Sequence, residues 1–137
     1  MSAMSERIPS TGQRILIVDD EENHRRSLAI GLRLDGWQVL EAKDGESALV
    51  VLDQHEVDIA IVDLMMPGIN GLDLARRVRF RYPGVRVVLT SAYHLSERQI
   101  ARAGVGAIAF VPKPYRLDEL ACFLREKLEM PPTAVSA

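Results

Sequence analysis

The stretch Ile15-Leu16-Ile17-Val18-Asp19-Asp20 sets the pattern from which the fold can be predicted. Four consecutive apolar residues, most of them β-branched, are typical of a strand buried on both faces of a parallel sheet, and the acidic pair marks the end of that strand. The same order, an apolar run followed by a polar side chain, returns at three later places. These are Asp63 after Ile59-Ala60-Ile61-Val62, Thr90 after Val87-Val88-Leu89, and Lys113 after Phe110-Val111.

Helical segments separate these apolar runs. We expect strands over about 14–18, 37–41, 57–62, 85–89 and 108–111. Apolar spacing and the cap residues Asp44, Asn70 and Ser96 predict helices over about 21–35, 45–54, 71–81 and 117–128, and a further one from about 97 to either Gly104 or Gly106. Five alternations of strand and helix require right-handed crossovers that cover both faces of the sheet. The predicted fold is α/β, a doubly wound five-stranded parallel sheet in a three-layer sandwich.

The polar strand ends should meet in this fold, because the carboxyl ends of parallel strands lie along one edge of the sheet. The carboxylates of Asp19, Asp20 and Asp63 would repel one another there unless a cation compensates them. Mg²⁺ prefers oxygen ligands, and the ammonium of Lys113 would act as a point charge on a phosphate. The sequence therefore predicts a site for a divalent cation and a phosphoryl group.

Each of these residues also has an ordinary structural explanation. Asp19 or Asp20 could cap the following helix, and a lysine at a strand end is usually solvated. The hydroxyl of Thr90 could serve the backbone only, and Phe110 could be a half-buried sheet residue. The convergence of four strand ends favours the chemical interpretation.

The composition excludes several classes of protein. Seventeen Lys and Arg against 19 Asp and Glu give a net charge of -2, so we expect no direct binding to nucleic acid or to a membrane surface. No apolar run approaches the roughly 18 residues of a membrane span, and the N-terminus lacks the order of a signal peptide. The single cysteine, Cys122, cannot form an internal disulfide and is expected to be at least half-buried, which fits a cytoplasmic protein.

The 137 residues suffice for one domain. Both ends are rich in small and polar residues with proline, as mobile tails are. We expect a flexible tail over 1–12, a folded domain over 13–129, and a tail or the start of a linker over 130–137.

The polar groups together resemble the receiver domain of two-component response regulators, a family that includes the chemotaxis response regulator. The matching segments are Asp19-Asp20, Asp63 to Gly71, Thr90-Ser91-Ala92 and Lys113-Pro114, in the family's order and approximate spacing. The resemblance covers residues 14–128. It implies a flavodoxin-like sandwich with strand order 2-1-3-4-5.

The resemblance also implies roles for individual residues. Asp63 would be the nucleophile that accepts a phosphoryl group from a sensor histidine kinase or a histidine phosphotransfer protein. Asp20, Asp63 and the backbone carbonyl of Met65 would ligate Mg²⁺, and Asp19 would act through a water. Lys113 would pair with the phosphoryl group.

A switch between two states is the second implication. The hydroxyl of Thr90 would move to a phosphoryl oxygen, and the vacated space would let Phe110 turn inward. The surface of the fourth helix, fifth strand and fifth helix would then change for a downstream effector protein or domain. The Lys113-Pro114 peptide would be cis. Such a chain is a phosphoacceptor in a phosphorelay that catalyses only its own phosphorylation and dephosphorylation, not an enzyme acting on a separate substrate.

The chain departs from the family pattern at two places. Ile108 and Ala109 stand where many receivers carry acidic residues, which removes charge pairs of the usual symmetric dimer and leaves at most a weak homodimer. Met65 and Ala92 flank the expected phosphorylation site and cannot orient an attacking water. We therefore expect slow to moderate loss of the phosphoryl group.

Other functions fit the sequence less well. An aspartyl-phosphate phosphatase would need a carboxylate two residues after the nucleophile, where this chain has Met65. The glycine patterns of a P-loop and of a dinucleotide site are absent from the sequence. An interaction module that works without phosphorylation on the same fold stays open, although the intact Asp63, Thr90 and Lys113 argue against it.

Overall fold

The chain alternates strand and helix five times in the computed structural model, which describes residues 13–92, 96–104 and 109–129. The elements are β1 (Arg14–Val18), α1 (Glu22–Leu34), β2 (Gln38–Ala42), α2 (Gly45–Gln54), β3 (Ile59–Asp63), α3 (Gly71–Arg81), β4 (Arg86–Ser91), α4 (Glu97–Ala103), β5 (Ala109–Pro112) and α5 (Leu117–Lys127). The five strands are parallel in the order β2-β1-β3-β4-β5, as predicted. The expected tails over 1–12 and 130–137, and Ile108, lie outside the described residues.

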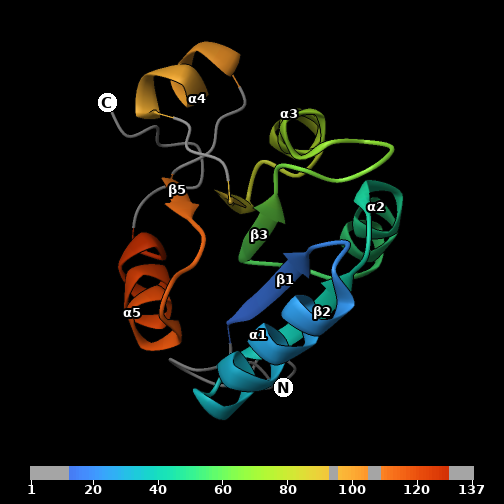
Figure 1. The fold of residues 1–137 in the computed structure, drawn as a ribbon. Helices are drawn as coiled ribbons and strands as arrows, with labels where there is room; N and C mark the ends of the chain where they lie inside the picture. The colour runs from blue at the N-terminus through green and yellow to red at the C-terminus, as the bar shows by residue number, and fades with distance from the viewer. Residues whose placement is uncertain (1–12, 93–95, 105–108, 130–137) are drawn as a thin grey trace.

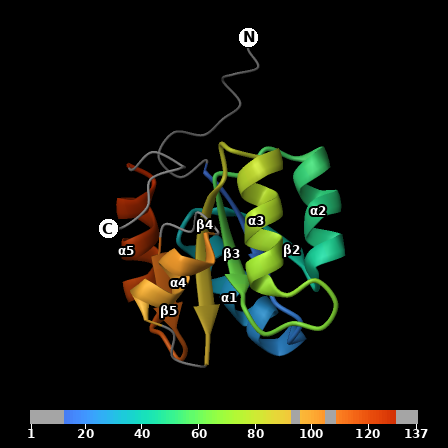
Figure 2. The same cartoon turned by 90° about the horizontal axis from the view of Figure 1, so that it is seen from above.

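The sheet is the middle layer of a sandwich, with helices on both of its faces (Figure 1, Figure 2). Alternate residues of β1 point to opposite faces, so Leu16 and Val18 join a core with α2 and α3, whereas Ile15 and Ile17 join a core with α1 and α5. Both cores contain buried aliphatic side chains from the central strands. Burial on both faces explains why these strands read as continuous apolar runs.

Strand boundaries differ slightly from the expected ones. β2 lies one residue later, β3 begins at Ile59, and β4 continues through Thr90 and Ser91. β3 and β4 do not stop before their polar residues, Asp63 and Thr90. The backbone hydrogen bonds between these two strands continue past them, since the N–H of Leu64 donates to the carbonyl of Thr90 at 2.9 Å. The polar residues therefore lie within or directly beside hydrogen-bonded strands, which fixes their positions.

The predicted helix starts are confirmed by their caps. Asp44, Asn70 and Ser96 each accept a hydrogen bond from a backbone N–H in the first turn, and Ser96 forms a full capping box with Gln99.

The prediction for Cys122 was wrong, since its thiol is exposed on α5. Within the described ranges, no helix is long and apolar enough to cross a membrane.

Gly71 begins α3 where that helix meets the end of β3. A Cβ at this position would lie 2.5 Å from the carbonyl oxygen of Asp63 and 2.6 Å from Cα of Leu64. Both neighbours are backbone atoms and cannot turn away. The absence of a side chain at Gly71 therefore sets how closely α3 approaches the strand end that carries Asp63.

We expect Gly71→Ala to lower the free energy of unfolding by about 2 kcal/mol, since an extra methyl must displace packed backbone. Gly84→Ala is the matched control, because a Cβ there meets nothing within 4 Å. Urea unfolding of both variants, followed by circular dichroism, checks this. Equal stability of the two variants would contradict the close approach at Gly71.

Candidate functional site

The alternation of side chains along the strands brings the predicted polar residues to one side of the sheet edge. Asp63 follows Ile59 and Ile61, which point toward α1 and α5, and Asp19 follows Ile15 and Ile17 in the same way. Thr90 pairs in register with Asp63. Strand order and side-chain parity together therefore place Asp19, Asp63 and Thr90 on one side of the same edge of the sheet.

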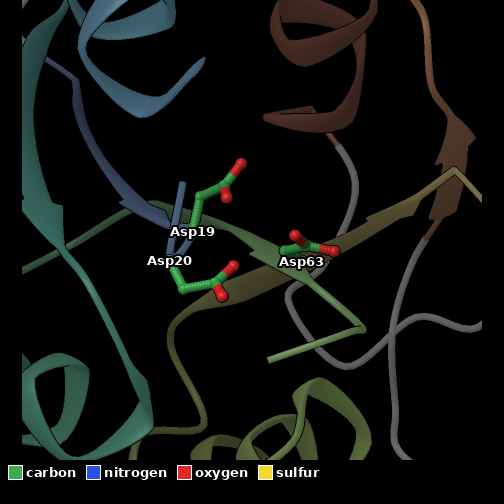
Figure 3. Close-up of side chains that lie close together, drawn as sticks. All are labelled: Asp19, Asp20 and Asp63. Carbon is green, nitrogen blue, oxygen red and sulfur yellow. The ribbon is translucent and has the colours of Figure 1, made fainter. Parts of the chain in front are cut away.

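Three carboxylates gather at this edge (Figure 3). Asp19 and Asp20 leave the end of β1, and Asp63 leaves the neighbouring end of β3. One oxygen from each lies within 4.8 Å of the others. Asp19 and Asp63 are buried, whereas Asp20 is exposed. An all-oxygen donor set of this spacing, open to solvent on one side, fits a hard divalent cation that keeps part of its water shell.

Lys113 provides the positive charge among these acids. Its Nζ lies 3.2 Å from Oδ2 of Asp19 and 3.4 Å from Oδ2 of Asp63. The backbone of Lys113 continues the sheet, because its N–H donates to the carbonyl of Ser91 at 2.9 Å. The Lys113-Pro114 peptide is cis, in agreement with the expectation from sequence. The ammonium thus bridges the two buried carboxylates.

The two buried acids have opposite electrostatic properties. Burial raises the pKa of Asp63, and the hydrogen bond from the N–H of Met65 and the charge of Lys113 offset it only in part. Burial acts in the same direction on Asp19, but hydrogen bonds from the N–H of Glu21 and from His24, with the charge of Lys113, outweigh it and lower its pKa. Asp63 is therefore the less stabilised anion.

Burial would lower the pKa of Lys113, but the charges of Asp19 and Asp63 outweigh it and raise that pKa. The lysine is thus held as an ammonium at neutral pH. A permanent cation that two carboxylates share can move to a third anion without changing its protonation state.

Thr90 is buried beside Asp63, and within the described residues its hydroxyl has no hydrogen-bond partner. Buried hydroxyls are nearly always paired, so an orphan one in a site indicates a group that pairs with something bound there.

Phe110 lies one strand further, half-buried against the core under α2 and α3. The side chains of Met65, two residues after Asp63, and of Ala92, two residues after Thr90, are exposed.

Two site residues were not predicted from the sequence. Nδ1 of His24 lies 2.7 Å from Oδ2 of Asp19, and the hydroxyl of Tyr115 lies 3.4 Å from Nε2 of His24. His24 follows Asp19 by five residues, so the first turn of α1 folds back over the strand end. A polar residue in that turn was the available signal, and the phenol that directly follows Lys113-Pro114 was the second.

Comparison with known proteins gives a consistent result. The family model described as the response regulator receiver domain matches residues 15–125. The response regulator MprA of a Mycobacterium species is 37% identical over 116 residues, which cover 84% of this chain and 50% of MprA. The chain thus spans about half the length of the curated relatives it matches.

Solved structures share the fold. A CheY-like receiver domain protein from Methanospirillum hungatei superimposes with a TM-score of 0.80 at 26% identity, over 85% of this chain and 94% of that one. The response regulator TrrA from Thermotoga maritima, solved in complex with Mg²⁺ and BeF, has a TM-score of 0.74 at 35% identity, with coverage of 85% and 98%.

Asp63→Asn should stabilise the folded chain. Because burial raises the pKa of Asp63, its ionised form at pH 7 opposes folding, and the uncharged amide removes that cost while keeping the shape. We expect the free energy of unfolding to rise by about 1 kcal/mol at pH 7, a common gain when a functional site is neutralised.

The gain of Asp63→Asn should be full above the folded pKa of Asp63 and vanish as the pH falls toward the unfolded value near 3.8, where the wild-type acid is itself neutral. Urea unfolding in metal-free buffer over this pH range measures it. A variant that is less stable than the wild type at pH 7 would show that the charge of Asp63 is well compensated.

Proposed function

This chain belongs to the family of response regulator receiver domains, and on that premise we propose that it accepts a phosphoryl group on Asp63 in a phosphorelay. The donor would be the phosphohistidine of a sensor histidine kinase or of a histidine phosphotransfer protein. The observation that carries the proposal is the orphan hydroxyl of Thr90 beside Asp63, with Lys113 on the same edge. A carboxylate, a cation and an unused donor are the groups that an acyl phosphate needs.

In the reaction, an oxygen of the Asp63 carboxylate attacks phosphorus, the P–N bond of the phosphohistidine breaks, and the electron pair leaves with the imidazole. Lys113 moves from the carboxylates to the incoming phosphoryl oxygens, and Thr90 donates its free hydroxyl to one of them. Bound Mg²⁺, held by Asp20, Asp63 and the carbonyl of Met65, with Asp19 reached through a water, would neutralise charge between carboxylate and phosphoryl group.

The switch would follow from the movement of Thr90. Pairing with a phosphoryl oxygen draws its hydroxyl toward Asp63, and Phe110 on the neighbouring strand turns inward. The surface of α4, β5 and α5 then presents a different shape to an effector protein or domain. A change of packing next to a new charge is sufficient to bias two states of such a surface.

The partners in this proposal are a kinase or phosphotransfer protein and an effector. The matched relatives are about twice as long as the matched region, which fits an effector domain joined to a receiver. We propose a cytoplasmic location, no direct contact with nucleic acid or membrane, and at most a weak homodimer. An aspartyl-phosphate phosphatase is disfavoured, because Met65 has no acidic proton to give to a leaving group.

Incubation with acetyl phosphate and Mg²⁺ should add one phosphoryl group to the wild type. Asp63→Asn should gain none, and chelation of Mg²⁺ should slow the wild type by at least about tenfold, since the metal offsets the charge repulsion. Intact-protein mass spectrometry measures the adduct. No adduct on the wild type, or an equal adduct on the variant, would contradict the proposal.

The phosphorylated chain should lose its phosphoryl group slowly to moderately, because the exposed side chains of Met65 and Ala92 offer no polar group to orient water. Met65→Asn would supply such a group and should shorten the half-life several-fold. Release of inorganic phosphate after removal of the donor measures both lifetimes. A half-life of seconds for the wild type would count against this reasoning.

A further inference from the structure

The imidazole of His24 contacts two other side chains beside the site. Its Nδ1 lies 2.7 Å from Oδ2 of Asp19, and its Nε2 lies 3.4 Å from the hydroxyl of Tyr115. The two rings meet edge to face, with centroids 5.8 Å apart. Because an ionised carboxylate can only accept, Nδ1 of His24 carries the hydrogen in its contact with Asp19, and Nε2 faces the phenol of Tyr115. Hydrogen on Nδ1 is the requirement that this geometry sets.

The carboxylate of Asp19 is buried and accepts several hydrogen bonds at this edge. Its side chain is only 3% exposed, and its Oδ2 is shared by His24 and by Lys113, the latter at 3.2 Å. Its other oxygen accepts the N–H of Glu21 at 2.9 Å. If the reaction draws Lys113 away, His24 is the donor that remains for Oδ2 among the residues that the structure describes.

We propose that His24 is a positioning residue, which holds the carboxylate of Asp19 in place for the cation and allows Lys113 to leave it. The inference rests on the proposed function, in which Lys113 moves to the phosphoryl group. A buried carboxylate that loses its donor is costly, so without His24 the ammonium of Lys113 should stay with Asp19. Groups that orient an outer ligand of a metal typically change affinity by about tenfold or more.

The role differs from that of an ordinary helix residue. The side chain of His24 is 31% exposed, so leucine at this position could pack on the ring of Tyr115 and satisfy the fold. Asparagine carries an N–H close to the position of Nδ1 but has no ring. A purely structural role would be preserved by leucine, whereas a donor role would be preserved by asparagine.

The test compares His24→Leu and His24→Asn with the wild type. Mg²⁺ affinity of the unphosphorylated protein is measured by NMR titration of backbone amides, and the rate of adduct formation with acetyl phosphate is measured at saturating Mg²⁺. We expect His24→Leu to weaken Mg²⁺ and slow the adduct, each by about tenfold, and His24→Asn to recover most of both. His55→Leu is the matched control, since His55 is exposed at the far end of α2.

Nitrogen shifts of the His24 ring give an independent readout, because they show whether Nδ1 carries a hydrogen. Hydrogen on Nδ1 is expected, and a ring with hydrogen on Nε2 alone would overturn the proposal. Wild-type Mg²⁺ affinity and rate in a folded His24→Leu, or equal losses in both His24 variants, would also overturn it. His24→Ala replaces the leucine variant if that one fails to fold. If the wild type forms no adduct, the proposed function fails, while the Mg²⁺ titration still tests His24.

Discussion

The ammonium of Lys113 between the carboxylates of Asp19 and Asp63 is the interaction on which the site depends. The strand order places β4 between the lysine and Asp63, and both β4 and β3 between the lysine and Asp19, so the cation must reach from the end of β5 across these strands. A long methylene stem permits this reach, and a small residue, Thr90, occupies the strand beneath it. Two acids at an apolar sheet edge would otherwise strongly oppose folding.

This arrangement also favours Asp63 over Asp19 for the proposed role of nucleophile. Asp19 accepts hydrogen bonds from Glu21, His24 and Lys113, which hold its negative charge in place. Asp63 accepts fewer hydrogen bonds, and its charge is the less stabilised of the two. A carboxylate that is poorly stabilised by its surroundings has more to gain from sharing electrons with phosphorus.

Most of the fold could be predicted from the sequence, because burial on both faces leaves a continuous apolar run and helix starts leave cap residues such as Asp44 and Asn70. The predicted strand ends were less accurate, since the backbone hydrogen bonds of β4 continue through Thr90 and Ser91 whatever the polarity of their side chains. The acidic cluster followed from parallel topology alone. His24 was missed because its importance depends on how α1 folds back over β1, which is a tertiary property. The exposure of Cys122 was missed because cysteine is usually buried, although this one lies off the apolar stripe of Leu120, Ala121 and Leu124 that α5 buries.

The orphan hydroxyl of Thr90 has a consequence for the energy of the whole domain. Among the described residues, the buried hydroxyl of Thr90 has no hydrogen-bond partner. In the proposed reaction, a phosphoryl oxygen that supplies the acceptor would remove this deficit, so the phosphorylated state would gain an interior hydrogen bond as well as charge. The resting protein would then be the less tightly bonded of the two proposed forms, and the proposed signal would include a tightening of the interior.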